Sequence, residues 1–167
     1  AVNDTSKNTP PDIERVVVTG DFRQTTLDQL SASATILDQA RLSSRQPSHI
    51  DSVLNSIPNV NFAAGASRGR FIQIRGIGER SQFAEPINPS VSFIVDEFDF
   101  SGLAAAGLIF DTKQLEVYRG PQATLYGTGA LAGAVKLTSN NVGSDAPDYV
   151  EARIGNKDSY RIEGATG

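Results

Sequence analysis

The most informative stretch of this chain of 167 residues reads Leu115-Glu116-Val117-Tyr118-Arg119-Gly120-Pro121-Gln122. Its first four residues predict a strand, because apolar, β-branched and aromatic side chains favour extended backbone. The Gly-Pro pair ends that strand and opens a turn-rich insertion over residues 120–133. A second strand is expected at Ala134–Thr138. The stretch therefore predicts two strands joined by an irregular connection.

One helix and four further strands are expected on the N-terminal side of this stretch. The helix is predicted over Pro47–Ile57, because Ile50, Val53, Leu54 and Ile57 recur at the spacing of one helical face. The strands are predicted at Ala34–Leu37, Asn59–Phe62, Phe71–Arg75 and Val91–Phe100. Short strands, one good helix and long loops indicate an α+β domain.

The composition excludes several classes of function. The net charge is −4, so the chain lacks the electrostatic attraction that nucleic-acid binding needs. The absence of cysteine excludes a disulfide scaffold, a thiolate zinc site and a cysteine nucleophile. A single histidine, His49, excludes a histidine-rich metal site. The longest apolar run, Gly102–Phe110, is too short for a membrane helix, and the length predicts one domain.

The two ends of the chain differ from the middle. Residues 1–12 are polar, contain Pro-Pro and show no period, which is typical of a flexible tail. The β-branched patch Val16–Val18 follows and is expected to lack a local pairing partner. At the other end, Tyr149–Ile154 and Tyr160–Glu163 alternate around a polar turn. They predict a hairpin that begins a larger sheet.

Four motifs are candidates for chemical sites. Gly127–Ala132 matches the G-x-G-x-x-A dinucleotide fingerprint, but a strand and not a helix follows it, so tight turns explain its glycines better. His49 has no G-x-S-x-G serine for a catalytic triad. The acidic cluster Asp96, Glu97 and Asp99 could serve a glycosidase or bind Ca²⁺, yet neighbouring strand residues point to opposite faces. The fourth set comprises Arg75, Glu116 and Arg119, which are either surface charges or a buried or interface ion-pair set.

The order of motifs along the chain resembles the plug domain of TonB-dependent outer-membrane receptors. The resemblance covers about residues 13–140, and the C-terminal remainder resembles the first hairpin of the barrel. The matching motifs are Val16-Val17-Val18-Thr19, Leu54-Asn55-Ser56-Ile57-Pro58-Asn59-Val60, Ile74-Arg75-Gly76, Val95-Asp96, Leu115 to Gln122, and Leu125-Tyr126-Gly127 onward to Gly133. In place of the Asp-Gly that is common in the family, this chain has Asp96-Glu97.

The resemblance implies a small mixed β-sheet with short helices and long loops, lodged in a 22-stranded barrel of which only the first hairpin is present. It implies a flexible segment over residues 1–21 with a TonB box at about 15–20, a plug over 22–145, and the start of the barrel over 146–167. The implied location is the outer membrane of a Gram-negative bacterium. The implied partners are the receptor's own barrel and the C-terminal domain of TonB in the TonB-ExbB-ExbD complex.

The resemblance also implies roles for particular residues. The TonB-binding residues would be Arg15, Val16, Val17, Val18 and Thr19. Arg75, Glu116 and Arg119 would pair with barrel carboxylates or with each other. A nutrient such as a siderophore, cobalamin, haem or an oligosaccharide would meet loops at the apex. The candidate ligand residues in those loops are Arg68, Arg70, Gln82, Phe83, Glu85, Phe100 and Ser101.

Two other functions remain open at the level of sequence. One is a soluble binding or adhesion module without transport. The other is a carbohydrate-active enzyme that uses Asp96 and Asp99. The family resemblance favours energy-coupled import without enzymatic activity, cofactor or bound metal.

Overall fold

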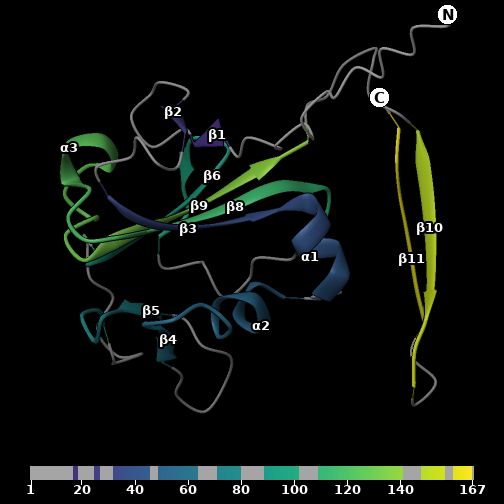
Figure 1. Ribbon diagram of the computed structural model, residues 1–167, viewed down its shortest axis with the longest axis horizontal. Coiled ribbons are helices and arrows are strands. Elements are labelled where there is room, and N and C mark those ends of the chain that lie inside the picture. The colour runs from purple at the N-terminus through teal and green to yellow at the C-terminus, as the bar shows by residue number, and fades with distance from the viewer. Residues whose placement is uncertain are drawn as a thin grey trace, which may run out of the picture.

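The computed structural model describes residues 17–18, 25–26, 32–45, 49–63, 71–79, 89–101, 109–140, 148–156 and 160–166 (Figure 1). Its centre is a mixed five-stranded sheet with the order β3-β8-β9-β6-β7. The bounds are β3 Ser33–Asp38, β6 Val91–Val95, β7 Phe98–Asp99, β8 Thr112–Arg119 and β9 Gly133–Ser139. Only the β6–β9 pair is parallel in this sheet. The expected α+β class with a small mixed sheet is confirmed.

Short elements surround the central sheet. The helices are α1 Gln39–Arg45, α2 Ile50–Leu54 and α3 Ala123–Tyr126. The remaining strands form two-stranded sheets, which are β1 Val17–Val18 with β2 Thr25–Thr26, β4 Val60–Ala63 with β5 Phe71–Ile74, and β10 Tyr149–Ile154 with β11 Tyr160–Ala165. The expected helix over residues 47–57 is therefore shorter, and its C-terminal part is a turn. Helix α1 was not expected, because Leu42 is its only buried residue and leaves no apolar period to detect.

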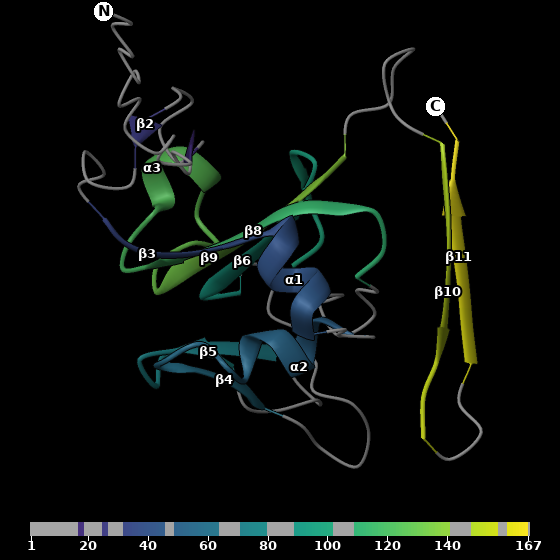
Figure 2. The ribbon, with the colours of Figure 1, turned by 45° about the vertical axis from the view of Figure 1, so that its right-hand side comes forward.

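The two faces of the sheet carry different cores. One face packs against α2, β4 and β5, which lie below the sheet in both ribbon views (Figures 1 and 2). Its cluster includes Val53, Ile74, Leu115 and Val135, each at most 1% exposed. The other face carries a small cluster of four buried residues, Ile36, Tyr118, Ala130 and Ala134. The larger cluster supplies most of the hydrophobic stabilisation because burial energy scales with apolar area.

Gly133 sets the contact between the hairpin β4–β5 and the end of the central sheet. Its φ is +158°, and an added Cβ would lie 2.3 Å from the Tyr118 carbonyl oxygen and 2.6 Å from Cδ1 of Ile74. No other residue fits this space without moving backbone. Gly133 pairs with Arg119, so the ends of β5 and β8 lie close together.

The turn between β6 and β7 uses two left-handed residues. Asp96 has φ +47° and Glu97 has φ +76°, the signature of a two-residue type I′ hairpin. The cost of this backbone conformation at Asp96 is offset by two hydrogen bonds. Its carboxylate accepts them from the backbone N–H of Ser139 at 2.8 Å and from the hydroxyl of Ser139 at 2.6 Å. Glu97 is exposed, and its carboxylate makes no comparable hydrogen bond to another described residue. The cost of its backbone conformation is therefore not offset locally.

Replacing Glu97 with glycine is expected to stabilise the chain. Glycine adopts positive φ without the steric cost that other residues pay, so the gain should be about 1 kcal/mol. Urea unfolding of the 167-residue chain measures this free energy directly. Glu97→Ala is the matched control: it removes the same side chain but keeps the strained backbone, so it should give no gain. An equal gain in both variants would attribute the effect to charge instead of backbone strain.

Candidate functional site

Glu116 lies buried in the middle of β8, with only 1% of its surface exposed. Its carboxylate accepts hydrogen bonds from the Tyr118 hydroxyl and, at 2.5 Å, from Nε2 of Gln114. Lys136 lies directly opposite on β9. The ring of Tyr118 also contacts Tyr126 of α3, with centroids 6.2 Å apart. Glu116 thus lies at the centre of a hydrogen-bonded set with Gln114 and Tyr118, on the face of the sheet that carries the smaller core.

Arg119 lies on the opposite face of the same strand. Its guanidinium donates to the Thr35 hydroxyl at 2.7 Å, the Ser33 hydroxyl at 3.2 Å and the Ala34 carbonyl at 3.5 Å. All three acceptors belong to β3. Because side chains three apart on a strand point to opposite faces, Arg119 and Glu116 do not pair with each other. The expectation of a mutual ion pair between them was wrong.

Arg75 follows β5 in a tight turn and is exposed. Its φ is +55°, and its backbone N–H donates to the Asn59 carbonyl at 2.8 Å. Ile74 lies against Gly133, the partner of Arg119, so both arginines belong to the same end of the domain. Within the described part of the chain, neither arginine forms an ion pair with a carboxylate.

The acidic residues around the β6–β7 turn do not converge on one site. Asp96 accepts hydrogen bonds from Ser139, whereas Asp99 accepts them from the Ser101 N–H at 2.8 Å and from its hydroxyl. Glu97 is exposed. Among the described residues, no three His, Cys, Asp or Glu side chains gather closely enough to hold a metal ion. The separate engagement of the two aspartates gives no pair of free carboxylates for glycoside hydrolysis.

Most of the candidate ligand residues lie outside the described residues, namely Arg68, Arg70, Gln82, Phe83 and Glu85. Phe100 is described and 42% exposed. The Ser101 hydroxyl donates to Asp99 and accepts a hydrogen bond from the Phe93 N–H at 3.0 Å. Ser101 therefore stabilises the β6–β7 hairpin, and Phe100 is the more accessible of the two.

The predicted TonB box is described only at Val17 and Val18, whereas Arg15, Val16 and Thr19 lie outside the described residues. Val17 pairs with Thr26 and Val18 with Thr25 in an antiparallel ladder. The expectation that this patch lacks a local partner was wrong. Sequence reasoning counted the threonines as polar, although their β-branched side chains favour strands as those of valine do.

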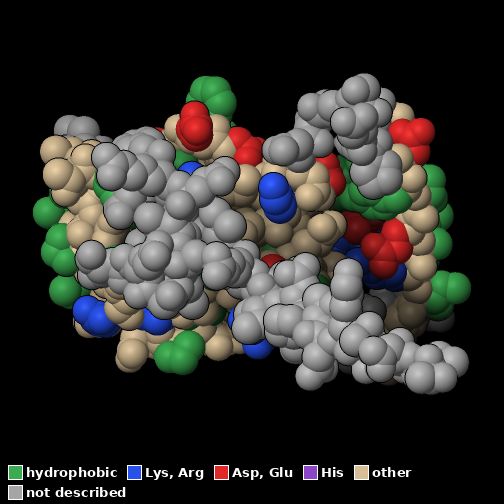
Figure 3. Space-filling view, turned by 45° about the horizontal axis from the view of Figure 1, so that its top comes forward, with side chains coloured by type: hydrophobic (Ala, Val, Ile, Leu, Met, Phe, Trp, Pro, Cys, Tyr) green, Lys and Arg blue, Asp and Glu red, His purple; other side chains and the backbone are tan. Residues whose placement is uncertain are grey.

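Hairpin β10–β11 has one apolar and one charged face. Val150, Ile154, Tyr160 and Ile162 share the outer face and are 73–92% exposed. In the space-filling view, hydrophobic side chains line the outer right-hand edge, and acidic and basic ones gather on its inner side (Figure 3). This alternation confirms the predicted two-faced hairpin.

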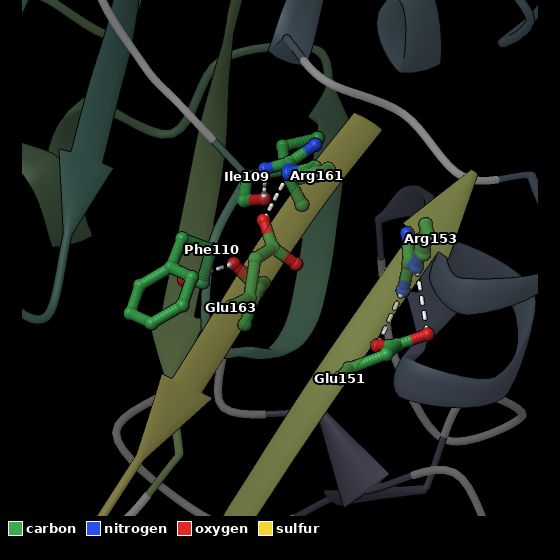
Figure 4. Close-up of polar contacts among 7 residues, drawn as sticks. Ile109, Phe110, Glu151, Arg153, Arg161 and Glu163 are labelled. Atoms are coloured by element: carbon green, nitrogen blue, oxygen red, sulfur yellow. Dashed lines mark hydrogen bonds and ion pairs between the residues drawn. The ribbon is translucent and has the colours of Figure 1, made fainter. Parts of the chain in front are cut away.

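The inner face carries four charged side chains that pair within their own strands (Figure 4). Arg153 makes a bidentate pair with Glu151, at 2.6 and 2.8 Å, and Arg161 pairs with Glu163. Across the ladder, Glu151 faces Glu163 and Arg153 faces Arg161. Sequence reasoning did not single out these residues as a site, although their alternation with apolar residues was the available signal.

A family described as TonB-dependent Receptor Plug Domain matches residues 26–134, and the chain belongs to this family. The pesticin receptor of Yersinia pestis is 27% identical over 132 residues, which are 78% of this chain and 19% of that protein. The vitamin B12 transporter BtuB of Vibrio vulnificus is 25% identical over 150 residues, 85% of this chain and 23% of that protein.

A solved structure shows the same fold. The ferric yersiniabactin uptake receptor FyuA from Yersinia pestis aligns with a TM-score of 0.66 and 27% identity, over 78% of this chain and 20% of that one. The chain thus spans about a fifth of the length of these relatives. Across the described residues, no helix combines the length and apolar character needed to cross a bilayer.

Proposed function

We propose that the chain closes the barrel of an outer-membrane receptor and admits a bound nutrient by energy-coupled import. The observation that carries this proposal is the family match over residues 26–134, which contains the central sheet from β3 to the start of β9. The similar proteins named above are a pesticin receptor, a vitamin B12 transporter and a ferric yersiniabactin uptake receptor. Import is therefore favoured over a soluble binding module or an enzyme.

The substrate we propose is a ferric siderophore or cobalamin. These are the ligand classes named for the FyuA structure and the B12 transporter. Haem and oligosaccharides remain open. The proposed contacts are the apex residues Arg68, Arg70, Gln82, Phe83, Glu85 and Phe100. Aromatic and cationic side chains suit a large, partly anionic chelate.

The plug would meet its barrel at two places. Arg75 and Arg119 lie at one end of the domain, and carboxylates of the barrel would supply the acidic partners that the described residues lack. Hairpin β10–β11 would be the first pair of barrel strands, with Val150, Ile154 and Ile162 facing lipid. Alternating apolar and polar residues are the pattern of outer-membrane strands. The domain limits proposed from sequence, 22–145 and 146–167, would assign the central sheet to the plug and this hairpin to the barrel.

The N-terminal segment would couple this gate to TonB. Among the described residues β1 pairs with β2 alone, and a partner strand can add to the other edge of such a strand. Main-chain hydrogen bonds would give most of the affinity. The energy source would be the TonB-ExbB-ExbD complex of the inner membrane.

Uptake by the full-length receptor tests this function. Cells that carry the receptor should accumulate labelled ferric siderophore or cobalamin, and collapse of the proton gradient with a protonophore should stop accumulation while surface binding persists. The control is an otherwise identical strain without the receptor. Binding without any accumulation in energised cells would support the soluble-module alternative. Accumulation that continues in the presence of the protonophore would contradict energy coupling.

A further inference from the structure

Asp111 lies where the central sheet meets hairpin β10–β11. It precedes β8, is partly buried, and has a left-handed backbone with φ +49°. Its carbonyl oxygen accepts the Asn140 N–H at 2.9 Å, and its Oδ1 accepts Nδ2 of Asn140 at 2.8 Å. Two hydrogen bonds from one residue hold the point where the chain leaves β9.

The same carboxylate also reaches the hairpin. The Tyr149 hydroxyl lies 3.5 Å from Oδ1 of Asp111, a long hydrogen bond. Asn140 and Tyr149 flank residues 141–148, which connect the sheet to the hairpin. A single carboxylate oxygen therefore contacts both ends of this connector.

A second contact joins the adjacent residues to the other strand of the hairpin. Nη2 of Arg161 lies 3.4 Å from the Ile109 carbonyl oxygen, and Arg161 is held in place by Glu163 (Figure 4). A cavity of about 190 Å³ lies between these elements, lined by Gln39, Leu42, Ile109, Asp111, Tyr149 and Arg153. The segment Ile109–Asp111 thus touches both hairpin strands at polar atoms.

The charges on this inner face are balanced within the hairpin. Each arginine pairs with a glutamate on its own strand, so the positive and negative charges of these four side chains cancel. The face therefore offers hydrogen-bond donors and acceptors and no net charge from these pairs. Partly exposed pairs of this kind contribute little net attraction to a third group. The position of the hairpin relative to the central sheet therefore depends more on the hydrogen bonds to Asp111 than on long-range attraction between charges.

We propose that Asp111 is the residue that positions the plug on the first barrel hairpin, by holding Asn140 and Tyr149 at the two ends of the connector. This proposal rests on the proposed function, in which β10–β11 belongs to the barrel wall. Asp111 would then fix this side of the plug against the first hairpin of the wall.

Distances between two spin labels in the full-length receptor test the proposal. These 167 residues contain no cysteine, so Lys113→Cys on the exposed part of β8 and Val150→Cys on the outer face of β10 give two defined sites. In membranes, the parent receptor should give one narrow distance distribution. Asp111→Gly, which permits positive φ but removes the carboxylate, should broaden the distribution and shift its mean.

Two further variants separate the side-chain contact from the backbone. Asp111→Asn keeps a short side chain suited to positive φ and retains an acceptor oxygen, so its distribution should stay narrow. Tyr149→Phe removes only the hydroxyl and should broaden it. The double variant Asp111→Gly/Tyr149→Phe should be no broader than Asp111→Gly alone. A narrow distance distribution in Asp111→Gly, or a broadened one in Asp111→Asn, would overturn the proposal. If Asp111→Gly fails to fold, a narrow distribution in Tyr149→Phe would overturn it instead.

The label at position 150 tests the underlying function separately. Its relaxation should respond to oxygen, which partitions into lipid, and not to a water-soluble nickel chelate. A label that responds mainly to nickel would show that the hairpin does not face lipid, which contradicts the barrel assignment whatever the distances show. A lipid-facing label with unchanged distances in every variant contradicts only the role of Asp111.

Discussion

Val17→Pro is expected to abolish energised uptake while ligand binding at the cell surface persists. Proline has no N–H to donate and is tolerated poorly in a strand that pairs on both sides. TonB would need to add a strand to the segment around Val17, and the substitution removes a main-chain donor from that segment. Val17→Ala keeps the donor and should retain most of the uptake.

The pairing of Val17 with Thr26 makes a second control necessary. Thr26→Pro disrupts the same local ladder but leaves every backbone N–H of the box in place. Uptake should survive in this variant. Equal loss in Val17→Pro and Thr26→Pro would mean that the β1–β2 hairpin itself matters and that strand addition at Val17 is not the cause. Normal transport by Val17→Pro would make this patch an ordinary part of a linker.

Glu116→Ala is expected to lower the free energy of unfolding by about 3 kcal/mol, because the truncation leaves buried donors without their acceptor. The donors are the Tyr118 hydroxyl and the Gln114 amide, and Glu116 itself is 1% exposed. A cavity at the same place adds to the loss. Urea unfolding of the 167-residue chain, compared with wild type, measures the difference.

Glu116→Gln is the matched control for this substitution. It preserves the volume and one acceptor oxygen while removing the charge, so the loss should be clearly smaller than for alanine. Wild-type stability of Glu116→Ala would mean that the carboxylate contributes nothing, as for a surface charge. Equal losses in both variants would assign the stabilisation to charge, in which case Lys136 on the neighbouring strand is the first partner to test.

Local signals in the sequence predicted several elements well. Apolar runs bounded by Gly and Pro placed strands at Leu115–Tyr118 and Ala134–Thr138, inside the observed β8 and β9. The run Val91–Phe100 was expected as one strand, but a left-handed turn at Asp96-Glu97 divides it into β6 and β7. Such a turn usually carries asparagine or glycine, and neither residue is present to signal it.

One feature of the candidate site was predictable but missed. Glu116 and Arg119 are three apart on a strand, so their side chains must point to opposite faces. The same reasoning had already separated Asp96 from Glu97 in the sequence. It excludes the mutual pair without any structure, and only the acceptors of Arg119 on β3 required coordinates.

The order of motifs along the chain indicated the class of the protein through its resemblance to a known family. Its main strands and the two faces of the C-terminal hairpin were predicted from alternation and turn chemistry, which act between residues close in the chain. Coordinates were needed to see that Val17 pairs with Thr26, that Arg75 and Arg119 belong to one end of the domain, and that Asp111 contacts both Asn140 and Tyr149. Contacts between distant segments depend on strand register, on the close approach of two backbones such as that at Gly133, and on the entropy of closing the intervening loops. None of these can be read from a short stretch of sequence.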